Sequence, residues 1–303
     1  MKFTNIIRQH WAALRALLVL TVIVGGAYPA LIWLVAQIPG LQDNANGSII
    51  EADGKPVGSS LIGQLFTDAD GNALPQYFQS RPSAAGDGYD PLATSASNLG
   101  PESIVDTLGD PSLPADDNGS KSSLLTLVCS RSVAAGKLDG VDGARPYCTG
   151  EGVGAVLSVI GPRDLTGPNA GQVVRPTRVV SVNEPCDTTP NPFVATYEGV
   201  RVECAKFGED YSIGQLVPVR GAAAADSKVP ADAVTASGSG LDPDISPAYA
   251  ELQVNRVAAA RGISAEQVRD VVAAHTDGRA LGFLGEPTVN VLGVNLALDQ
   301  LTK

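Results

Sequence analysis

One apolar stretch limits what this 303-residue chain can be. Residues 16–37, ALLVLTVIVGGAYPALIWLVAQ, form a run of 22 residues without a charge. Because an α-helix rises about 1.5 Å per residue, such a run is long enough to cross roughly 30 Å of hydrocarbon. We therefore expect residues 16–37 to form a single transmembrane helix that follows a short N-terminal segment, residues 1–15.

The charges on either side of this run predict its orientation. Lys2, Arg8 and Arg15 precede it, whereas the first charges that follow are Asp43 and Glu51. Positively charged flanks stay in the cytoplasm, so we expect a cytoplasmic N-terminus and an extracytoplasmic main domain on a single-pass protein of the cell membrane. A cleaved signal peptide is the alternative, but the run is longer than a usual signal core and no small-x-small cleavage site follows it.

Small residues gather within the apolar run. Gly25 and Gly26 lie close to Pro29 in the sequence GGAYP. Because glycines let a neighbouring transmembrane helix approach closely, these three residues predict a face that packs against a partner in the membrane. The alternative is that glycine and proline are simply common in membrane helices.

The overall charge excludes one class of partner. The formal net charge is −11 and the isoelectric point is about 4.6. Nucleic-acid binding requires clustered Lys and Arg side chains to neutralise phosphates, and the sequence has no such cluster. We expect contacts with membrane lipid through the anchor and none with nucleic acid.

Four cysteines fall within one window outside the apolar run: Cys129, Cys148, Cys186 and Cys204. In an oxidising compartment an even number of cysteines indicates two disulfides, with three possible pairings that the sequence leaves open. Zinc is the alternative, but the sequence has no C-x-x-C pair and both histidines lie far from the window.

The rest of the chain predicts an α+β fold with an insertion. Residues 38–109 and 229–303 have the composition of two parts of one α+β domain. Between them, residues 110–228 hold the cysteines and several β-branched runs punctuated by Gly and Pro, which predict an inserted β-rich, disulfide-stapled module and a linker. Residues 46–66 predict two strands with a tight connection, and PESIVDTLG at 101–109 predicts a brief helix.

The C-terminal part carries clear helix signals. Ser246 is placed as an N-cap with proline next to it, and Gly262 stops this helix. Ser264 and Gln267 form a capping box for a second helix. The final segment PTVNVLGVNLALDQL, residues 287–301, predicts a strand and a closing helix.

The sequence offers no candidate catalytic, cofactor-binding or metal-ligating residues. It has no G-x-x-x-x-G-K-[ST] phosphate loop. A hydrolase would depend on His275 as its base, but a helix-capping role explains this histidine better. Asp242 and Asp244 are too few oxygen ligands for a hard cation, and turn and helix-start positions account for both.

A long segment without helical or strand periodicity, YFQSRPSAAGDGYDPLATSASNLGP, occupies residues 77–101. Loops of this length are usually functional when they are ordered. We expect Pro, Asp, Ser and Asn to fix its turns and Arg81 to bind buried carbonyls or a carboxylate.

Several segments together resemble the C subunit of the bacterial Kdp potassium-uptake ATPase. The insertion is similar to that of the actinobacterial forms. The matching segments are GGAYP, NGSII, GSSLIGQLF, the loop at 77–101, and the stretches 229–262 and 285–301.

The resemblance implies a non-catalytic accessory subunit of an ATP-driven potassium pump. Its partners would be a potassium-channel-like subunit, a P-type ATPase catalytic subunit and a small hydrophobic subunit. The complex would use ATP, Mg and K, none of them bound by this chain, although a chaperone role in ATP binding has been attributed to the family. The loop residues Arg81 and Tyr89 are the candidates for contact with the conducting subunit. The alternative function is a stand-alone, membrane-anchored extracytoplasmic binding protein.

Overall fold

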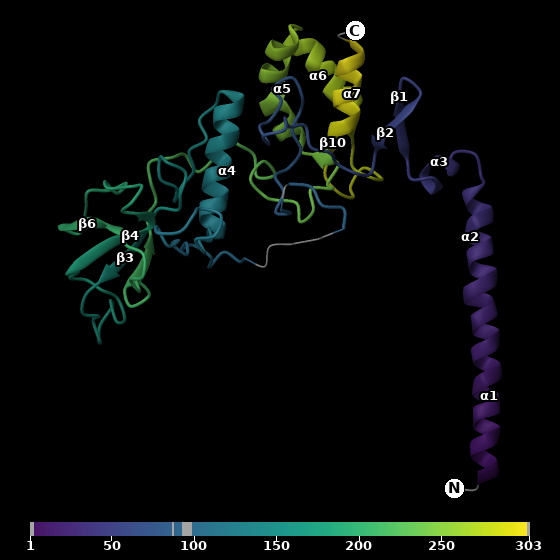
Figure 1. Cartoon of the computed structure of the whole chain (residues 1–303), viewed down its shortest axis with the longest axis horizontal. Helices are drawn as coiled ribbons and strands as arrows, with labels where there is room; N and C mark the ends of the chain where they lie inside the picture. Colours follow the sequence, from purple (N-terminus) through teal and green to yellow (C-terminus); the bar gives the residue numbers. More distant parts are fainter. Residues whose placement is uncertain (1–2, 87, 93–98, 302–303) are drawn as a thin grey trace. The chain divides into compact units, whose positions relative to one another are not determined.

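The computed structural model describes residues 3–86, 88–92 and 99–301. The chain divides into two compact units, Met1–Ile62 and Gly63–Lys303. The first unit begins with one continuous helix that the eye can follow in Figure 1. It consists of α1 (Phe3–Val22), a π-helical turn η1 (Ile23–Ala27) and α2 (Tyr28–Ala36).

This helix contains the predicted membrane span. Thr4–Ala36 has a mean hydropathy of 2.2, none of it is buried, and by length and composition it could cross a membrane. Within the described ranges it is the one helix that meets this test. The helix starts before the uncharged run, at Phe3, and so includes the charged residues Arg8 and Arg15.

A short helix and a β-hairpin complete the first unit. They are α3 (Gln42–Ala45), β1 (Ile49–Ala52) and β2 (Lys55–Ser59). The two strands pair antiparallel, with Ala52 opposite Lys55. Asp53 and Gly54 both have positive φ, 50° and 73°, as the tightest hairpin turns require. The predicted pair of strands with a tight connection is confirmed.

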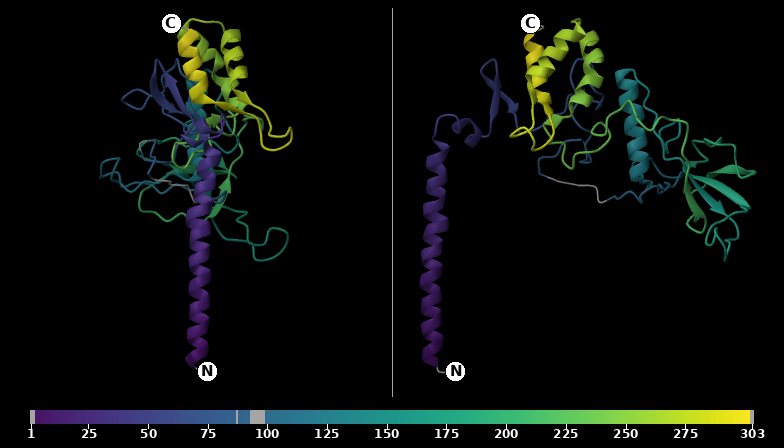
Figure 2. Two further views of the ribbon diagram at one scale, coloured as in Figure 1. Left: turned by 90° about the vertical axis from the view of Figure 1, so that its right-hand side faces the viewer. Right: turned by 180° about the vertical axis from the view of Figure 1, so that it is seen from behind.

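The second unit contains a helical layer next to a small antiparallel sheet. The right-hand view of Figure 2 shows the green and yellow helices of this unit beside one another. They are α5 (Pro247–Arg261), α6 (Ala265–Ala274) and α7 (Val291–Leu301). The sheet has the order β8 (Asp244–Ile245), β10 (Thr288–Asn290), β9 (Thr276–Asp277). Side chains of these elements, among them Val254 and Leu298, form a buried core with Phe78.

The predicted helix ends are confirmed. The Ser246 hydroxyl accepts the Tyr249 N–H at 3.0 Å, and Gly262 ends α5 with φ 66°. Ser264 and Gln267 form the expected capping box at the start of α6. Each hydroxyl satisfies one of the N–H groups that a helix start leaves without an internal partner.

The predicted insertion contains a sheet and also a helix that the sequence did not predict. The helix is α4 (Leu124–Asp139). The five-stranded sheet has the order β5 (Thr196–Tyr197), β6 (Val200–Ala205), β4 (Arg178–Pro185), β3 (Val156–Ile160), β7 (Gln215–Pro218). Only the pairing of β4 with β6 is parallel. The insertion is therefore mixed α and β rather than purely β-rich.

The brief helix expected over 101–109 is wrong. These residues form turns and an isolated bridge between Thr107 and Lys121. The Asn183 side chain from β4 donates to Ile104 O at 2.8 Å and accepts from Asp106 N–H at 2.8 Å. These backbone groups thus bond to a distant amide instead of to a helical turn, so tertiary contacts override the local preference.

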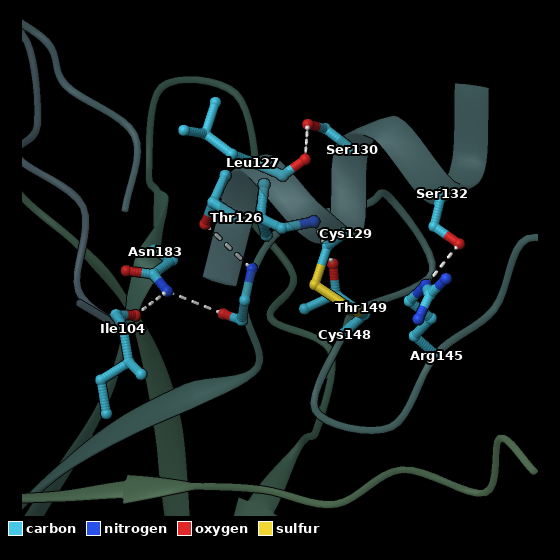
Figure 3. Close-up of a disulfide and its surroundings, with 12 residues drawn as sticks. Ile104, Thr126, Leu127, Cys129, Ser130, Ser132, Arg145, Cys148, Thr149 and Asn183 are labelled. Carbon is cyan, nitrogen blue, oxygen red and sulfur yellow. Dashed lines mark hydrogen bonds between the residues drawn. A yellow bond between two sulfur atoms is a disulfide. The ribbon is translucent and has the colours of Figure 1, made fainter. Parts of the chain in front are cut away.

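Both predicted disulfides are present. Cys129 on α4 bonds to Cys148, and Cys186 at the end of β4 bonds to Cys204 in β6. Figure 3 shows the first bridge between α4 and the segment that leads to β3, with the Asn183 amide nearby. The structure selects one of the three pairings that the sequence left open, and all four thiols are used by it.

Candidate partner-binding surfaces

The glycines of the anchor lie where the helix widens. Tyr28 N–H bonds to Ile23 O, five residues back, in the π-helical turn. Pro29 follows and has no N–H to give to the carbonyl of Gly25. A π-turn at this point relieves the clash between a proline ring and the carbonyl four residues earlier.

The chain itself does not require glycine at these positions. A Cβ on Gly26 would meet no atom within 4 Å, and one on Gly25 would meet only the Thr21 methyl at 4.0 Å. Glycine in a helix costs about 1 kcal/mol relative to alanine. The pair therefore leaves a shallow, unfilled surface on an exposed apolar helix.

The start of the predicted loop is held by two buried amides. Asn295 on α7 accepts Phe78 N–H at 2.8 Å and donates to Phe78 O at 3.0 Å. Gln253 on α5 does the same for Gln79, at 2.7 and 3.1 Å. Both amides are at most 1% exposed. Each supplies the acceptor and the donor that a neighbouring strand would otherwise supply.

Two arginines of α5 bind the carbonyl groups just before these residues. Arg256 donates to Pro75 O at 2.7 Å and to Tyr77 O at 2.9 Å. Arg261 donates to Gln76 O at 2.7 Å, and its guanidinium lies 5.0 Å from the centre of the Tyr77 ring. Segment 75–79 is therefore fixed without regular secondary structure.

A carboxylate of the insertion holds one of these arginines. Asp139 at the end of α4 bonds to Arg256 Nε at 2.7 Å, and both side chains are buried. Burial raises the pKa of the Asp139 carboxyl, and the hydrogen bond and charge of Arg256 oppose this shift. Removing one partner of such a pair leaves an uncompensated buried charge. The insertion thus helps to position the loop.

Arg81 has the internal partners that its sequence context predicts. Its guanidinium forms an ion pair with Asp242 at 2.8 Å and donates to Thr235 O at 3.1 Å. The side chain is partly exposed. The structure therefore uses Arg81 to join the loop to the segment before β8.

The middle of the loop runs beside the same segment. Ser237 N–H donates to Pro82 O at 2.7 Å, and Ala84 N–H donates to Ser237 O at 2.8 Å. Tyr89 is 36% exposed. Of the predicted loop, residue 87 and residues 93–98 lie outside the described residues. Arg81 and Tyr89 thus lie on the same loop in different surroundings. Arg81 is paired with Asp242, whereas Tyr89 is exposed to solvent.

The other candidates for chemistry also have internal partners. Asp242 is paired as described, and Asp244 accepts a hydrogen bond from Asn290 Nδ2 at 3.1 Å. His275 ends α6, with Nδ1 2.9 Å from Val271 O, which is the expected capping role. Over the described ranges, no three His, Cys, Asp or Glu side chains gather to hold a metal ion.

The residues that hold the loop were missed by sequence reasoning. Gln253 lies on the same helix face as the buried residues Ala250 and Val254, and Asn295 lies between Val294 and Leu298. An amide on an otherwise apolar helix face was the available signal, because buried polar groups require partners. The sequence does not reveal which backbone those amides bind.

Comparison with known proteins gives a consistent result. A family model described as "K+-transporting ATPase, c chain" matches residues 10–106 and 214–300. A protein of Kineococcus radiotolerans named potassium-transporting ATPase KdpC subunit is 36% identical over 295 residues, covering 97% of this chain and 95% of that protein. This chain belongs to the KdpC family.

Further KdpC relatives agree. The protein of Mycobacterium tuberculosis is 36% identical over 294 residues, covering 97% of this chain and 99% of its own. That of Streptomyces coelicolor is 38% identical over 306 residues, covering 98% and 95%. The predicted resemblance, including its actinobacterial character, is confirmed.

The KdpC family model leaves out residues 107–213, which contain α4 and most of the five-stranded sheet. The alignments with the actinobacterial relatives run through this region. In the structure it is tied to the matched part by side chains of α4 and the following turn. Arg131 donates to Val234 O at 3.1 Å, and Arg145 donates to Val229 O and to Pro230 O.

Proposed function

We propose that this chain is a non-catalytic accessory subunit of an ATP-driven, high-affinity potassium-uptake complex. It assembles and stabilises a potassium-channel-like subunit, a P-type ATPase catalytic subunit and a small hydrophobic subunit. Membership of the KdpC family and the apolar N-terminal helix support this proposal. ATP, Mg and K serve the complex through its other subunits.

In this proposal the anchor helix crosses the membrane once, with a cytoplasmic N-terminus and an extracytoplasmic main domain. The distribution of Lys2, Arg8 and Arg15 before the span supports this orientation. The helix packs against partner helices through Gly25, Gly26 and Pro29. The observation that carries the proposal is the unfilled space above Gly26, which a neighbouring backbone could occupy.

The outer domain contributes a fixed surface rather than a reaction. The backbone polar groups at the start of the loop are already hydrogen-bonded within the chain. Their partners are the side chains of Arg256, Arg261, Asn295 and Gln253. The loop then presents Tyr89 and the partly exposed Arg81 for contact with the conducting subunit. Pre-organisation of such a loop lowers the entropy cost of association.

The proposal is tested by filling the space at the glycines. Gly26→Leu should reduce recovery of the channel-like subunit with the tagged ATPase subunit by about tenfold, because the added side chain holds the helices apart. Val19→Leu, on an exposed part of the same helix, is the matched control. Equal recovery with both variants, in membranes that contain equal amounts of each, would count against packing through this face.

A further inference from the structure

The hairpin loop between β9 and β10 is well defined by its own backbone. Ala280 N–H donates to Leu284 O, and Leu284 N–H donates to Ala280 O, both at 2.9 Å. Gly282 N–H donates to Arg279 O at 3.0 Å. At the base of the loop, Arg279 and Glu286 form an ion pair at 2.5 Å. Residues 278–286 are thus an ordered protrusion.

Three large apolar side chains stand at its tip. Leu281 is 83% exposed, Phe283 69% and Leu284 50%. Adjacent exposed apolar side chains of this size commonly mark an interaction site, whereas isolated ones are ordinary. Each Å² of apolar surface removed from water yields about 25 cal/mol, so covering this tip would be favourable.

The backbone conformation at the tip holds these side chains in their exposed positions. Leu281 has φ 54°, in the left-handed region that disfavours residues with a Cβ. Such a conformation costs of the order of 1 kcal/mol and persists only where surrounding structure enforces it. Gly282 and Gly285, with φ 80° and 79°, complete the turn. Because the Leu281 side chain is exposed, its burial within the chain does not offset this cost.

The charges around the tip distinguish between two kinds of partner, a lipid surface and a protein pocket. Residues 278–286 contain one cation and one anion, Arg279 and Glu286, and these pair with each other. Loops that insert into lipid headgroups combine apolar residues with Lys or Arg that attract anionic lipid. This loop has no net charge and belongs to a chain of formal charge −11. An apolar protein pocket suits it better.

We propose that the hairpin tip is a docking element whose Leu281 and Phe283 side chains enter an apolar pocket on another subunit of the ATPase. This inference rests on the proposed function, since it requires a partner subunit. The ordered backbone means that little conformational entropy is lost on docking. A phenylalanine at the centre of a contact is a common energetic anchor.

The test uses the intact complex, purified through a tag on the ATPase subunit. Leu281→Ser combined with Phe283→Ser should reduce recovery of the complex at least about tenfold. Leu165→Ser, at a leucine that is 90% exposed in the insertion, is the control and should have no effect. Because the replaced side chains are exposed, the unfolding temperature of the variant chain should stay unchanged. Recovery equal to the control would overturn the inference.

A second measurement identifies the occupant directly. A photo-crosslinking phenylalanine analogue at position 283 should form an adduct with a partner subunit in membranes, and the same analogue at position 165 should form none. An adduct with lipid, or none with protein, contradicts the docking element. If the hairpin variants assemble normally but deletion of the whole chain disrupts assembly, the proposed function stands and only the hairpin inference fails.

Discussion

At the scale of single residues, the amide of Asn295 makes the two hydrogen bonds that a neighbouring strand would make. It bonds the N–H and the C=O of Phe78, which is 217 positions away in the sequence. Gln253 likewise bonds the N–H and the C=O of Gln79. The helix pattern around these amides was readable, because the caps and the apolar spacing are local. Their partners were not readable, because no local rule connects a helix face to a loop so distant.

Replacing Asn295 should measure this contribution. Asn295→Leu keeps a branched side chain at this position but leaves the buried N–H and C=O of Phe78 without partners, which should lower the free energy of unfolding by roughly 2 kcal/mol. Gln300→Leu removes an exposed amide from the same helix and should change little. Denaturant unfolding of the purified chain gives both values. A loss for Asn295→Leu no greater than for Gln300→Leu would exclude the strand-like role.

Tyr249 predicts a pH dependence at the alkaline end. Its ring is buried, and burial raises the pKa of the phenol above its usual value. Above about pH 10 the unfolded chain therefore holds fewer protons here than the folded chain, and the free energy of unfolding falls as pH rises. The contribution of this group is fully present below that pH.

The variant Tyr249→Phe removes this titration. Between about pH 9 and about pH 11 it should lose less stability than the natural chain, by thermal unfolding at each pH. Tyr147→Phe, at an exposed tyrosine, provides the comparison and should follow the natural chain. Parallel losses for the natural chain and Tyr249→Phe would show that other groups control the alkaline transition.

At the scale of elements, α4 shows why a helix can escape sequence analysis. Its buried face consists of Thr126, Cys129, Ser132 and Gly136. Small and polar residues at helical spacing give no apolar stripe, which is the main helix signal in a sequence. The start and end were marked by a Ser123 cap and by Gly140, but these signals resemble those of turns. By contrast, α5 and α6 have caps and apolar spacing together.

Close packing against this small face gives a prediction at Gly136. A Cβ there would lie 2.7 Å from the Gly143 backbone, too close for any atom pair of this kind. Gly136→Ala should therefore lower the free energy of unfolding by about 1 to 3 kcal/mol, although alanine favours helices. Ser130→Ala, at an exposed position of α4, should be neutral or slightly stabilising. A stabilised Gly136→Ala variant would contradict the close contact.

At the scale of the whole molecule, the insertion is joined to the family core by charges. Asp139, Arg131 and Arg145 of the insertion reach α5 and the segment that precedes β8. The sequence predicted an insertion over residues 110–228, because the composition changes near both of its ends. It gave no sign that the extra residues support the loop, because a buried ion pair between distant segments leaves no local pattern.

The family and the anchor could be predicted from sequence, whereas the exposed hairpin tip could not. The segments GGAYP and GSSLIGQLF are distinctive in order and spacing. In the run RALGFLG, however, apolar letters alone do not separate a buried turn from an exposed one. Only the structure shows that Leu281 and Phe283 face solvent.

We propose above all that this chain holds the potassium-transporting complex together. The most direct measurement is recovery of the channel-like subunit through a tag on the ATPase catalytic subunit, from cells with and without this chain. We expect recovery to fall by about tenfold or more without the chain and to return when it is supplied again. Undiminished recovery together with undiminished potassium uptake in its absence would contradict this assembly role.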